Sequence, residues 1–309
     1  MQIIESTTTL PYSGITATIG FFDGVHAGHR ALLADVKRIS TDMGLDSGVI
    51  TFREHPKKIL TGEPMPLLTS LDERMELLAA TGIDYCILLD FSHDIARLSA
   101  QEFIQYIRDY FHVRHLVIGY DHRFGHNRNE TPADYMRYGA ELGVSISQST
   151  ACIPAGQKVS SSVVRHLLTD GKVDEAARLL TYHYALRGCV VAGRQIGRTI
   201  GFPTANIVCC DAEKLIPATG AYAVRVTTDA GKSFGGMLNI GTRPTIHSSD
   251  CKQSIEAHLF DFDDTIYGQE LQIEFVKYLR PERRMNDLNA LHAQLQQDKA
   301  LAKEILRAL

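Results

Sequence analysis

Several features that would assign the chain to a common class of protein are missing. No apolar run approaches about 18 residues, so the sequence predicts no membrane span. The net charge is only −4, with acids and bases mixed along the chain, which gives no basic face for nucleic acid. The start, MQIIESTTTL, lacks the basic residues and apolar core of a secretory signal, so we expect none.

The cysteines lack the spacing of a zinc site or a redox motif. All 6 are scattered, at positions 86, 152, 189, 209, 210 and 251, and no Cys-x-x-Cys occurs. Such cysteines are typical of reduced thiols in a cytoplasmic protein. Internal repeats and low-complexity segments are also missing. The length of 309 residues therefore fits two globular domains, each of roughly 150 residues.

The first half of the chain alternates strand-like and helix-like segments. Apolar segments predict strands at residues 17–22, 47–52, 85–91 and 115–120. Capping signals predict that helices begin at Ser70, Ser99 and Thr131. Glycines at 82 and 143 are predicted to end two of these helices. This alternation predicts an α/β domain with a parallel sheet, in which ligands bind beyond the carboxyl ends of the strands.

The pattern of predicted secondary structure changes after about residue 184. Short β-rich segments lie at residues 185–193, 204–210, 220–228, 234–241, 254–262 and 271–279, with a helical segment at 287–309. This pattern predicts a small antiparallel barrel or sandwich that a C-terminal helix closes. The predicted domains are residues 1–183 and 184–309.

Two histidines stand where the first of these strands gives way to a helix. In GFFDGVHAGH, His26 and His29 are three residues apart, so they share one face at a helix N-terminus. The N–H groups and the helix dipole favour an anion there, and imidazoles can donate hydrogen bonds to phosphate. Gly20, Gly24 and Gly28 would let a phosphate approach the backbone. Solvated histidines or a metal pair are the alternatives, although no third ligand cluster accompanies the pair.

A second candidate phosphate site is the segment SSSVVR, residues 160–165. It places hydroxyl groups at a helix N-terminus, with Arg165 three residues after Ser162. This arrangement suits a β- or γ-phosphate, while an ordinary helix cap is the alternative.

The second half holds a glycine-rich stretch, GRQIGRTIGFPTANI, that is not a Walker loop because no GK[ST] follows. Thr204 and Asn206 are two apart, so on a strand they face one side. Their oxygens could coordinate a hard cation that bridges nucleotide phosphates. In SIEAHLFDF, Glu256 could take a proton from an alcohol, or could be a solvent-facing strand residue.

These motifs carry a resemblance to known enzymes. HAGH resembles the HxGH signature of nucleotidyltransferases, and SSSVVR resembles the ISSSxIR motif of their small members. The segments GRTIGFPTANI, GMLNIGTRPTI and residues 255–284 resemble the bacterial riboflavin kinase domain, and the first half resembles the FMN adenylyltransferase to which that kinase is fused. Over residues 15–309 the chain thus resembles the bifunctional riboflavin kinase/FMN adenylyltransferase family, the prokaryotic FAD synthetases.

The resemblance implies substrates, a cofactor and residue roles. ATP, riboflavin and FMN would be substrates, FAD the product and Mg²⁺ the cofactor. The implied catalytic residues are His26, His29, Ser162 and Arg165 for adenylyl transfer and Glu256 for phosphorylation of riboflavin, with Thr204 and Asn206 on the metal. The implied nucleotide contacts are Gly20, Phe21, Phe22, Asp23, Gly24, Gly193, Gly197, Arg198, Gly201, Phe202 and Pro203. The implied flavin pocket is made by Phe52, His55, Pro56, Asp121 and Phe124.

The chain departs from the family pattern at two positions beside the flavin contacts. Glu54 stands where the family often has Pro, and His122 stands where it often has Phe. Three alternatives are disfavoured by the residues present or missing. The intact HAGH and SSSVVR segments argue against one active domain with a flavin-storing partner domain. The presence of Glu256, Thr204 and Asn206 argues against a flavin-binding regulatory protein, and the missing KMSKS loop and the acidic balance argue against a synthetase-like RNA enzyme. We expect small-molecule substrates only, without nucleic acid or membrane, and a monomer or weak oligomer.

Overall fold

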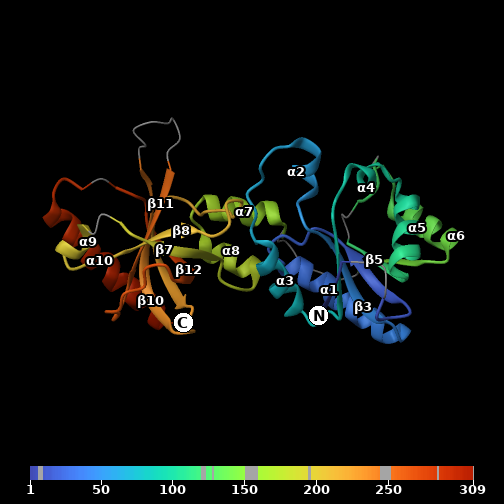
Figure 1. Ribbon diagram of the computed structural model, residues 1–309, viewed down its shortest axis with the longest axis horizontal. Coiled ribbons are helices and arrows are strands. Elements are labelled where there is room, and N and C mark those ends of the chain that lie inside the picture. The colour runs from blue at the N-terminus through green and yellow to red at the C-terminus, as the bar shows by residue number, and fades with distance from the viewer. Residues whose placement is uncertain are drawn as a thin grey trace. The chain divides into compact units, whose positions relative to one another are not determined.

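The computed structural model describes most of the chain. The described residues are 1–5, 10–119, 123–126, 129–149, 159–193, 196–243, 252–283 and 285–308, without the side chains of 196, 243 and 252. Asp121 and His122, which the sequence analysis singled out, lie outside them. By its contacts the chain divides into two compact units, Met1–Ser160 and Ser161–Leu309. Figure 1 labels many of the elements of both units.

The first unit contains a parallel sheet. Its strands are β1 (Gln2–Ile4), β2 (Ile15–Ile19), β3 (Asp46–Phe52), β4 (Tyr85–Leu89), β5 (Val113–Ile118) and β6 (Ser145–Gln148), in the order β1-β4-β3-β2-β5-β6. Every pair of neighbours is parallel, as predicted. The sequence analysis missed β1 and β6, which are short edge strands. It also placed the end of β2 three residues too late, at residue 22, because the apolar segment continues beyond Ile19 while the strand does not.

The helices of this unit are α1 (Ala27–Met43), α2 (Pro56–Thr61), α3 (Leu71–Ala79), α4 (His93–Arg97), α5 (Ala100–Phe111) and α6 (Pro132–Leu142). The predicted capping signals are confirmed, because Ser70, Ser99 and Thr131 each form a reciprocal box with the residue three positions on. Gly143 ends α6 in a left-handed conformation, as predicted. The prediction that Gly82 ends α3 was wrong by a few residues, because the helix stops at Ala79.

Helices cover both faces of the sheet, so adjacent strand residues enter different cores. On β3, Ile50 belongs to a core that includes residues of α5 and α6, whereas Val49 belongs to one that includes residues of α1 and α3. All five residues of β2 are buried. This two-sided burial is the reason why the strands read as continuous apolar runs in the sequence.

The second unit begins with α7 (Ser161–Thr169) and α8 (Val173–Leu180) and continues into a closed barrel. The strands are β7 (Ala185–Val191), β8 (Ala205–Cys209), β9 (Gly220–Thr228), β10 (Ser233–Arg243), β11 (Lys252–Leu259) and β12 (Glu270–Arg280), in the order β10-β11-β8-β7-β12-β9. All pairs are antiparallel. The prediction of a barrel of six strands is therefore confirmed, including the closing helix α10 (Leu288–Arg307).

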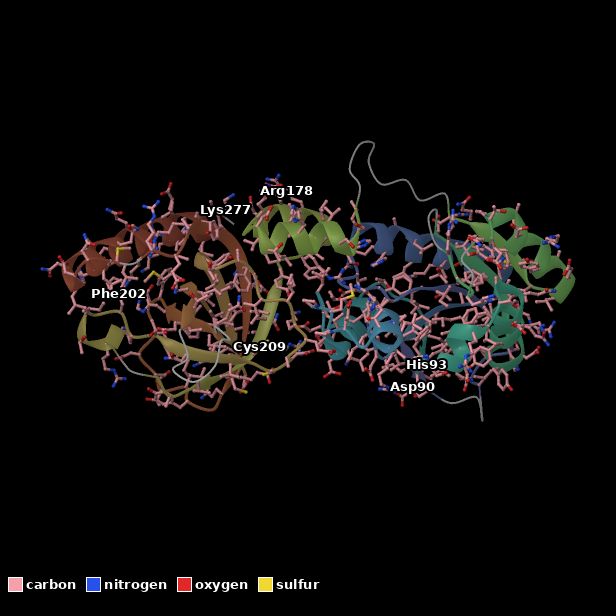
Figure 2. All side chains as sticks on the ribbon, turned by 90° about the horizontal axis from the view of Figure 1, so that it is seen from above. Asp90, His93, Arg178, Phe202, Cys209 and Lys277 are labelled. Atoms are coloured by element: carbon pink, nitrogen blue, oxygen red, sulfur yellow. The ribbon has the colours of Figure 1, made fainter. Side chains whose placement is uncertain are left out.

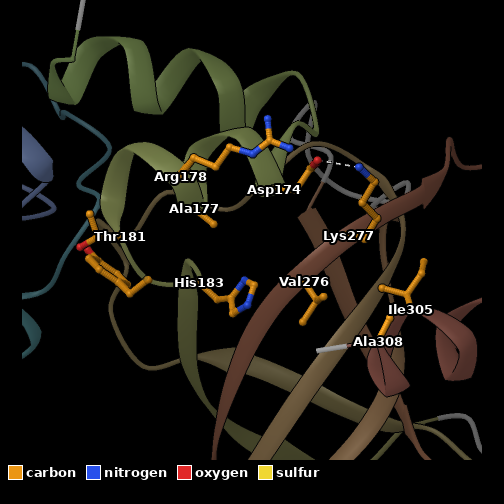
Figure 3. Close-up of a pocket in the computed structure, with 10 residues that line it drawn as sticks. Asp174, Ala177, Arg178, Thr181, His183, Val276, Lys277, Ile305 and Ala308 are labelled. Carbon is orange, nitrogen blue, oxygen red and sulfur yellow. Dashed lines mark hydrogen bonds and ion pairs between the residues drawn. The ribbon is translucent and has the colours of Figure 1, made fainter. Parts of the chain in front are cut away.

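Helices α7 and α8 group with the barrel by their contacts. Asp174 of α8 forms a 2.6 Å ion pair with Lys277 of β12, which Figure 3 shows as a dashed line. The amide of Ala218 donates to the carbonyl of Leu168 at the end of α7, at 3.0 Å. The predicted domain boundary, between residues 183 and 184, instead places these two helices with the sheet. The assignment of one enzymatic activity to each predicted domain stays a prediction.

Candidate active sites

The two histidines of the HAGH segment stack at the start of α1. His26 is the N-cap of this helix, and its Nδ1 accepts the backbone N–H of His29 at 3.3 Å. The two rings are nearly parallel, with centroids 3.6 Å apart, so the predicted common face is confirmed. The Phe22 ring packs edge-on against His29 at 5.0 Å. Since a neutral imidazole with an accepting Nδ1 carries its proton on Nε2, His26 keeps a donor.

The sheet order places this pair at a switch point. Strand β2 pairs with β3 on one side and with β5 on the other, and α1 follows β2 directly. From β2 the chain continues to β3 and β4 on one side, and after β4 it crosses to β5 on the other side of β2. The connections that follow β2 and β5 therefore run in opposite directions along the sheet. In open α/β sheets, ligands bind outside the carboxyl ends of the strands at such a crevice. His26 therefore lies where the fold itself favours a ligand.

The loop between β2 and His26 is a tight turn with left-handed backbone. Phe22 has φ 58°, Gly24 has φ 78° and Val25 has φ 35°. A non-glycine residue rarely adopts such values, and a β-branched one does so only where the surroundings enforce it. Phe22 and Val25 are both buried, so core packing holds the turn. The Phe22 ring lies over Gly20, where an added Cβ would be 3.1 Å from it.

Asp23 fastens this loop to the segment before α3. Its carboxylate accepts the amide of Leu68 at 3.0 Å from each oxygen, and both the amide and the hydroxyl of Thr69 at 3.0 Å. The amide of Gly24 donates to Oγ1 of Thr69 at 3.1 Å. Asp23 thus has a structural task, while its contact with nucleotide stays a prediction.

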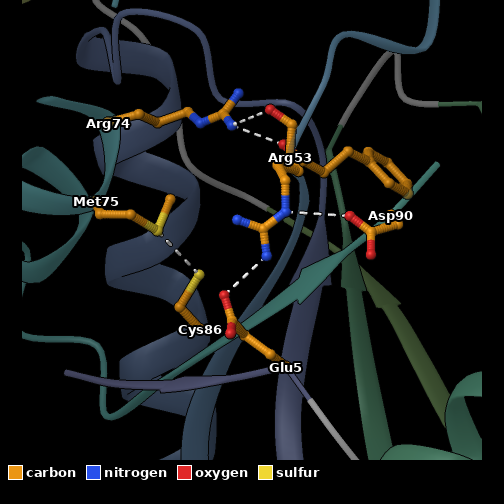
Figure 4. Close-up of polar contacts among 7 residues, drawn as sticks. Glu5, Arg53, Arg74, Met75, Cys86 and Asp90 are labelled. Carbon is orange, nitrogen blue, oxygen red and sulfur yellow. Dashed lines mark hydrogen bonds and ion pairs between the residues drawn. The ribbon is translucent and has the colours of Figure 1, made fainter. Parts of the chain in front are cut away.

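A buried arginine that the sequence analysis missed ties the same loop to β3. Arg74 of α3 donates to the carbonyl of Phe21 at 3.2 Å. It also donates to the carbonyls of Phe52 and Arg53, at 2.6 and 3.3 Å (Figure 4). Burial lowers the pKa of Arg74 to about 10, and the Asp23 carboxylate opposes that shift. The guanidinium is therefore still a cation at neutral pH, and it joins the ends of two neighbouring strands.

The predicted flavin contacts fall into two groups in the structure. His55 caps α2, Pro56 is the first residue of that helix, and the His55 ring meets Phe21 edge-on at 4.5 Å. Glu54, one of the two departures from the family pattern, forms a 3.0 Å ion pair with Lys58 on the surface. This group therefore contains the aromatic pair of Phe21 and His55 and, next to it in sequence, the ion pair of Glu54 and Lys58.

Phe52 and Phe124 form the second group, and both belong to one buried core. The Phe52 ring meets Phe91 edge-on at 5.1 Å. The Phe124 ring stacks on Tyr135 at 4.3 Å, and the Tyr135 hydroxyl lies 3.2 Å from both the amide and the carbonyl of Phe124. Both side chains are buried in this core, and their contact with flavin stays a prediction.

Ser162 and Arg165 lie at the beginning of α7, in the second unit. Ser162 is exposed and Arg165 is half-buried. The helix starts at Ser161, so the predicted helix N-terminus is confirmed, while the phosphate-binding role of both residues stays a prediction.

The barrel unit contains a cavity of about 320 Å³ that strands and α10 line together. Its wall includes the predicted residues Gly197, Phe202, Thr204 and Glu256, and also Asn239, His258, Arg280 and Asp298. Phe202, labelled in Figure 2, is buried. Arg198, Gly201 and Pro203 are exposed and lie outside this wall. The volume is in the range of small-molecule sites.

Glu256 stands between two asparagines in the barrel. In the register of β11, it lies opposite Asn206 of β8 and opposite Asn239 of β10. The Thr204 hydroxyl donates to Oε2 of Glu256 at 3.4 Å. The structure therefore brings together the three predicted residues of this site and adds Asn239, which no local sequence signal marked.

The glycine-rich loop packs directly on these residues. A Cβ on Gly193 would collide with Nδ2 of Asn206, and one on Gly197 would collide with the carbonyl of Phe202. The amide of Phe202 donates to the carbonyl of Gly197 at 2.8 Å, after the short helix α9 (Ile196–Thr199). At Gly197 the obstacle is backbone, so glycine is needed there, whereas a side chain at Gly193 would displace the Asn206 amide.

Neutral and charged groups line another part of the cavity. His258 is buried, and its Nδ1 lies 2.8 Å from the carbonyl of Pro203. Burial lowers the pKa of His258, so its ring is neutral at pH 7. Arg280 of β12 forms a bidentate ion pair with Asp298 of α10, at 2.8 to 3.0 Å. This ion pair holds α10 over the cavity. The sequence analysis missed the pair because its two residues are distant in sequence and no local pattern links them.

A second hollow in this unit lies between α8, β12 and the end of α10. Its volume is about 710 Å³, and its wall includes Arg178, His183 and Ile305 (Figure 3). None of the predicted site residues lines it.

Comparison with known proteins assigns each unit to a family. A family described as FAD synthetase matches residues 11–163, and one described as riboflavin kinase matches residues 180–306. A bifunctional riboflavin kinase/FMN adenylyltransferase of Listeria monocytogenes is 37% identical over 284 residues, 91% of this chain and 88% of the relative. The protein of that description from Escherichia coli K12 is 36% identical over 303 residues, 97% of this chain and 96% of the relative.

A solved structure that covers nearly the whole chain is also similar to it. A crystal structure described as a macrolide-efflux protein from Streptococcus pneumoniae has a TM-score of 0.86 and 30% identity, covering 97% of this chain and 98% of that one. In the part of the chain that the structure describes, no helix is long and apolar enough to span a membrane.

The two folds and the two family matches define a transferase with a nucleotidyltransferase unit and a kinase unit. The chain belongs to the bifunctional riboflavin kinase/FMN adenylyltransferase family. It phosphorylates riboflavin to FMN with ATP and adenylylates FMN with ATP to give FAD and pyrophosphate. The function expected from the sequence is thereby confirmed.

Proposed function

We propose that the barrel cavity around Glu256 is the site of riboflavin phosphorylation and that the HAGH loop is the site of FMN adenylylation. The observation that carries the first assignment is the meeting of Thr204 and Glu256 at the wall of a cavity, with Asn206 opposite Glu256 in the strand register. The geometry of the stacked histidines at a helix N-terminus carries the second.

In the kinase step, Glu256 accepts the proton of the riboflavin 5′-hydroxyl as that oxygen attacks the γ-phosphorus of ATP. The Thr204 hydroxyl, 3.4 Å away, holds the carboxylate in place. Asn206 and Asn239 flank it on the neighbouring strands and limit its movement. The apolar part of the wall, which includes Phe202 and Leu291, suits a flat isoalloxazine ring.

The oxygen-rich donor set around Glu256 fits Mg²⁺. Thr204 supplies a hydroxyl oxygen and Asn206 an amide oxygen, both ligands that a hard cation prefers. Gly193 lies against the Asn206 side chain and so defines its position. Thr204 and Asn206 would hold the ion, which when bound would neutralise charge on the ATP phosphates.

In the adenylylation step, His26 and His29 donate hydrogen bonds to the phosphates of ATP while a phosphate oxygen of FMN attacks the α-phosphorus. Their donors favour the charge that develops as pyrophosphate leaves. The N-terminus of α1 adds N–H groups and a favourable dipole. Ser162 and Arg165 bind the β- and γ-phosphates from the α7 N-terminus. Phe52, His55, Pro56, Asp121 and Phe124 bind the flavin and adenine rings.

A magnesium titration tests the kinase assignment. Thr204→Val removes an oxygen but keeps the shape, so we expect a higher Mg²⁺ concentration for half-maximal FMN formation and a kinase rate at least about 10-fold lower. Adenylylation of added FMN, measured in the same sample, is the internal control and should be unchanged. Equal Mg²⁺ dependence of FMN formation in the variant and the wild type would remove Thr204 from the metal site.

A further inference from the structure

Two thiols and a carboxylate gather on the barrel outside both of the sites proposed above. Cys189 lies on β7, Cys210 follows β8, and Glu270 begins β12. The two Sγ atoms are 3.7 Å apart, and Sγ of Cys210 is 3.8 Å from Oε2 of Glu270. One ligand atom from each residue lies within 4.8 Å of the other two. Both thiols are exposed, so solvent can reach the group.

The strand register explains why these side chains meet. Glu270 lies directly opposite Cys189 where β12 pairs with β7. Cys189 lies opposite Val208 of β8, and the amide of Cys210 donates to the carbonyl of Arg187 at 3.0 Å. Cys189 and Cys210 are therefore diagonal neighbours across one pair of strands, within reach of each other. Because β8, β7 and β12 are consecutive in the barrel, the group spans three strands.

The distances agree with a tetrahedral metal site. With Zn–S near 2.3 Å and Zn–O near 2.1 Å, tetrahedral angles separate two sulfurs by about 3.8 Å, and a sulfur and an oxygen by about 3.6 Å. The observed separations are 3.7 and 3.8 Å. Both separations that involve Cys210 thus match the ideal spacing, and the third, between Cys189 and Glu270, is no longer than 4.8 Å.

We propose that Cys189, Cys210 and Glu270 bind a thiophilic divalent cation such as Zn²⁺ or Cd²⁺, with a solvent molecule as the fourth ligand. Two thiols and one carboxylate form a set that such ions accept. Each bound ion displaces the two thiol protons, which enter the solvent. The ion links β8, β7 and β12 and so stabilises the barrel against unfolding.

A disulfide between the same thiols is the competing use of this pair. It requires an oxidant, and the sulfurs must approach to about 2.05 Å. A disulfide would not involve the Glu270 carboxylate, whereas a cation would bind all three groups. The geometry therefore favours the metal.

Titration with Cd²⁺ alone tests the proposal on the full-length, untagged protein, freed of metal and kept reduced. We expect one Cd²⁺ per chain with a thiolate-to-cadmium absorption band in the ultraviolet, and a barrel unfolding temperature that rises with Cd²⁺. Cys189→Ser and Cys210→Ser should lose the band, and Glu270→Gln should bind at least 10-fold more weakly, roughly the cost of losing one supporting group at a metal site. Cys209→Ser is the matched control, since Cys209 (labelled in Figure 2) is next to Cys210 but lies outside the group.

A measurement on the unaltered protein guards against variants that fail to fold. Bound Zn²⁺ should slow alkylation of Cys189 and Cys210 at least 10-fold, mapped by mass spectrometry, and leave Cys209 unaffected. A band that survives in Cys189→Ser, or alkylation that Zn²⁺ does not slow, would overturn the metal site. So would a Cys189–Cys210 disulfide that forms in air even with Zn²⁺ present, because the thiols would then prefer oxidation to metal.

Discussion

Loss of the Asp298 carboxylate should destabilise the barrel unit far more than its single charge suggests. Asp298 accepts hydrogen bonds from Arg280 and from Gln294 of its own helix, at 2.8 to 3.0 Å. The side chains of Arg280 and Asp298 are only 17% and 5% exposed. In Asp298→Ala the Arg280 guanidinium therefore stays buried without its counter-ion.

The size of the effect follows from this burial. Removing one partner of a buried ion pair costs about 3–5 kcal/mol, and the partial exposure of Arg280 argues for the lower end, about 3 kcal/mol. For a unit of this size, 1 kcal/mol shifts the unfolding temperature by about 2–4 °C, so we expect a decrease of about 6–12 °C. Replacing both partners by apolar residues, in Arg280→Met with Asp298→Leu, should recover much of this loss.

Calorimetry of the full chain measures the barrel transition directly. Lys303→Ala is the matched control on α10, because it breaks a more exposed pair with Asp261, whose side chain is 82% exposed. Exposed pairs contribute about 0–1 kcal/mol, so this variant should unfold within a few degrees of the wild type. If Asp298→Ala and Lys303→Ala shift the transition equally, the ion pair does not hold α10 on the barrel.

Three further predictions concern other parts of the chain. Gly193→Ala should lower the rate of FMN formation at least about 10-fold and spare adenylylation of FMN, because its methyl group would collide with the Asn206 side chain and displace it. Unchanged FMN formation would contradict this close packing. Arg74→Met should lower the free energy of unfolding of the sheet unit by about 3 kcal/mol, because three carbonyls lose a charged donor. A urea unfolding curve that matches the wild type would contradict this. Burial lowers the pKa of His115 below its ordinary 6.5, so the unfolded chain binds the proton first and stability should fall as pH drops below about 6.5. The urea midpoint at pH 7.5 and 5.5 should change less in His115→Gln than in the wild type, and equal changes would exclude His115 as the cause.

The sequence predicted those elements whose signals are local. The capping boxes at Ser70 and Ser99, the alternation of the barrel strands and the spacing of His26 and His29 all act within a few residues, and each is confirmed. The end of β2 was wrong because apolar content alone cannot show that Phe22 turns into a left-handed conformation.

The residues that were missed depend on strand register or on distant packing. Asn239 lies beside Glu256 only because β10 pairs with β11 in one register. Arg74 reads as an ordinary charged residue of an amphipathic helix, yet it is buried on three carbonyls that lie more than 20 residues away along the chain. Such contacts form between segments distant in sequence, so no local pattern encodes them.

Complementation between two variants tests the central claim that two separate sites work in sequence. Glu256→Gln should lose at least about 10²-fold in FMN formation, and His29→Ala at least about 10²-fold in FAD formation. With ATP, Mg²⁺ and riboflavin, chromatography should find no FAD from Glu256→Gln, FMN alone from His29→Ala, and FAD from the mixture of both. If either variant loses both reactions, or if the mixture yields no FAD, the assignment of one reaction to each unit is contradicted.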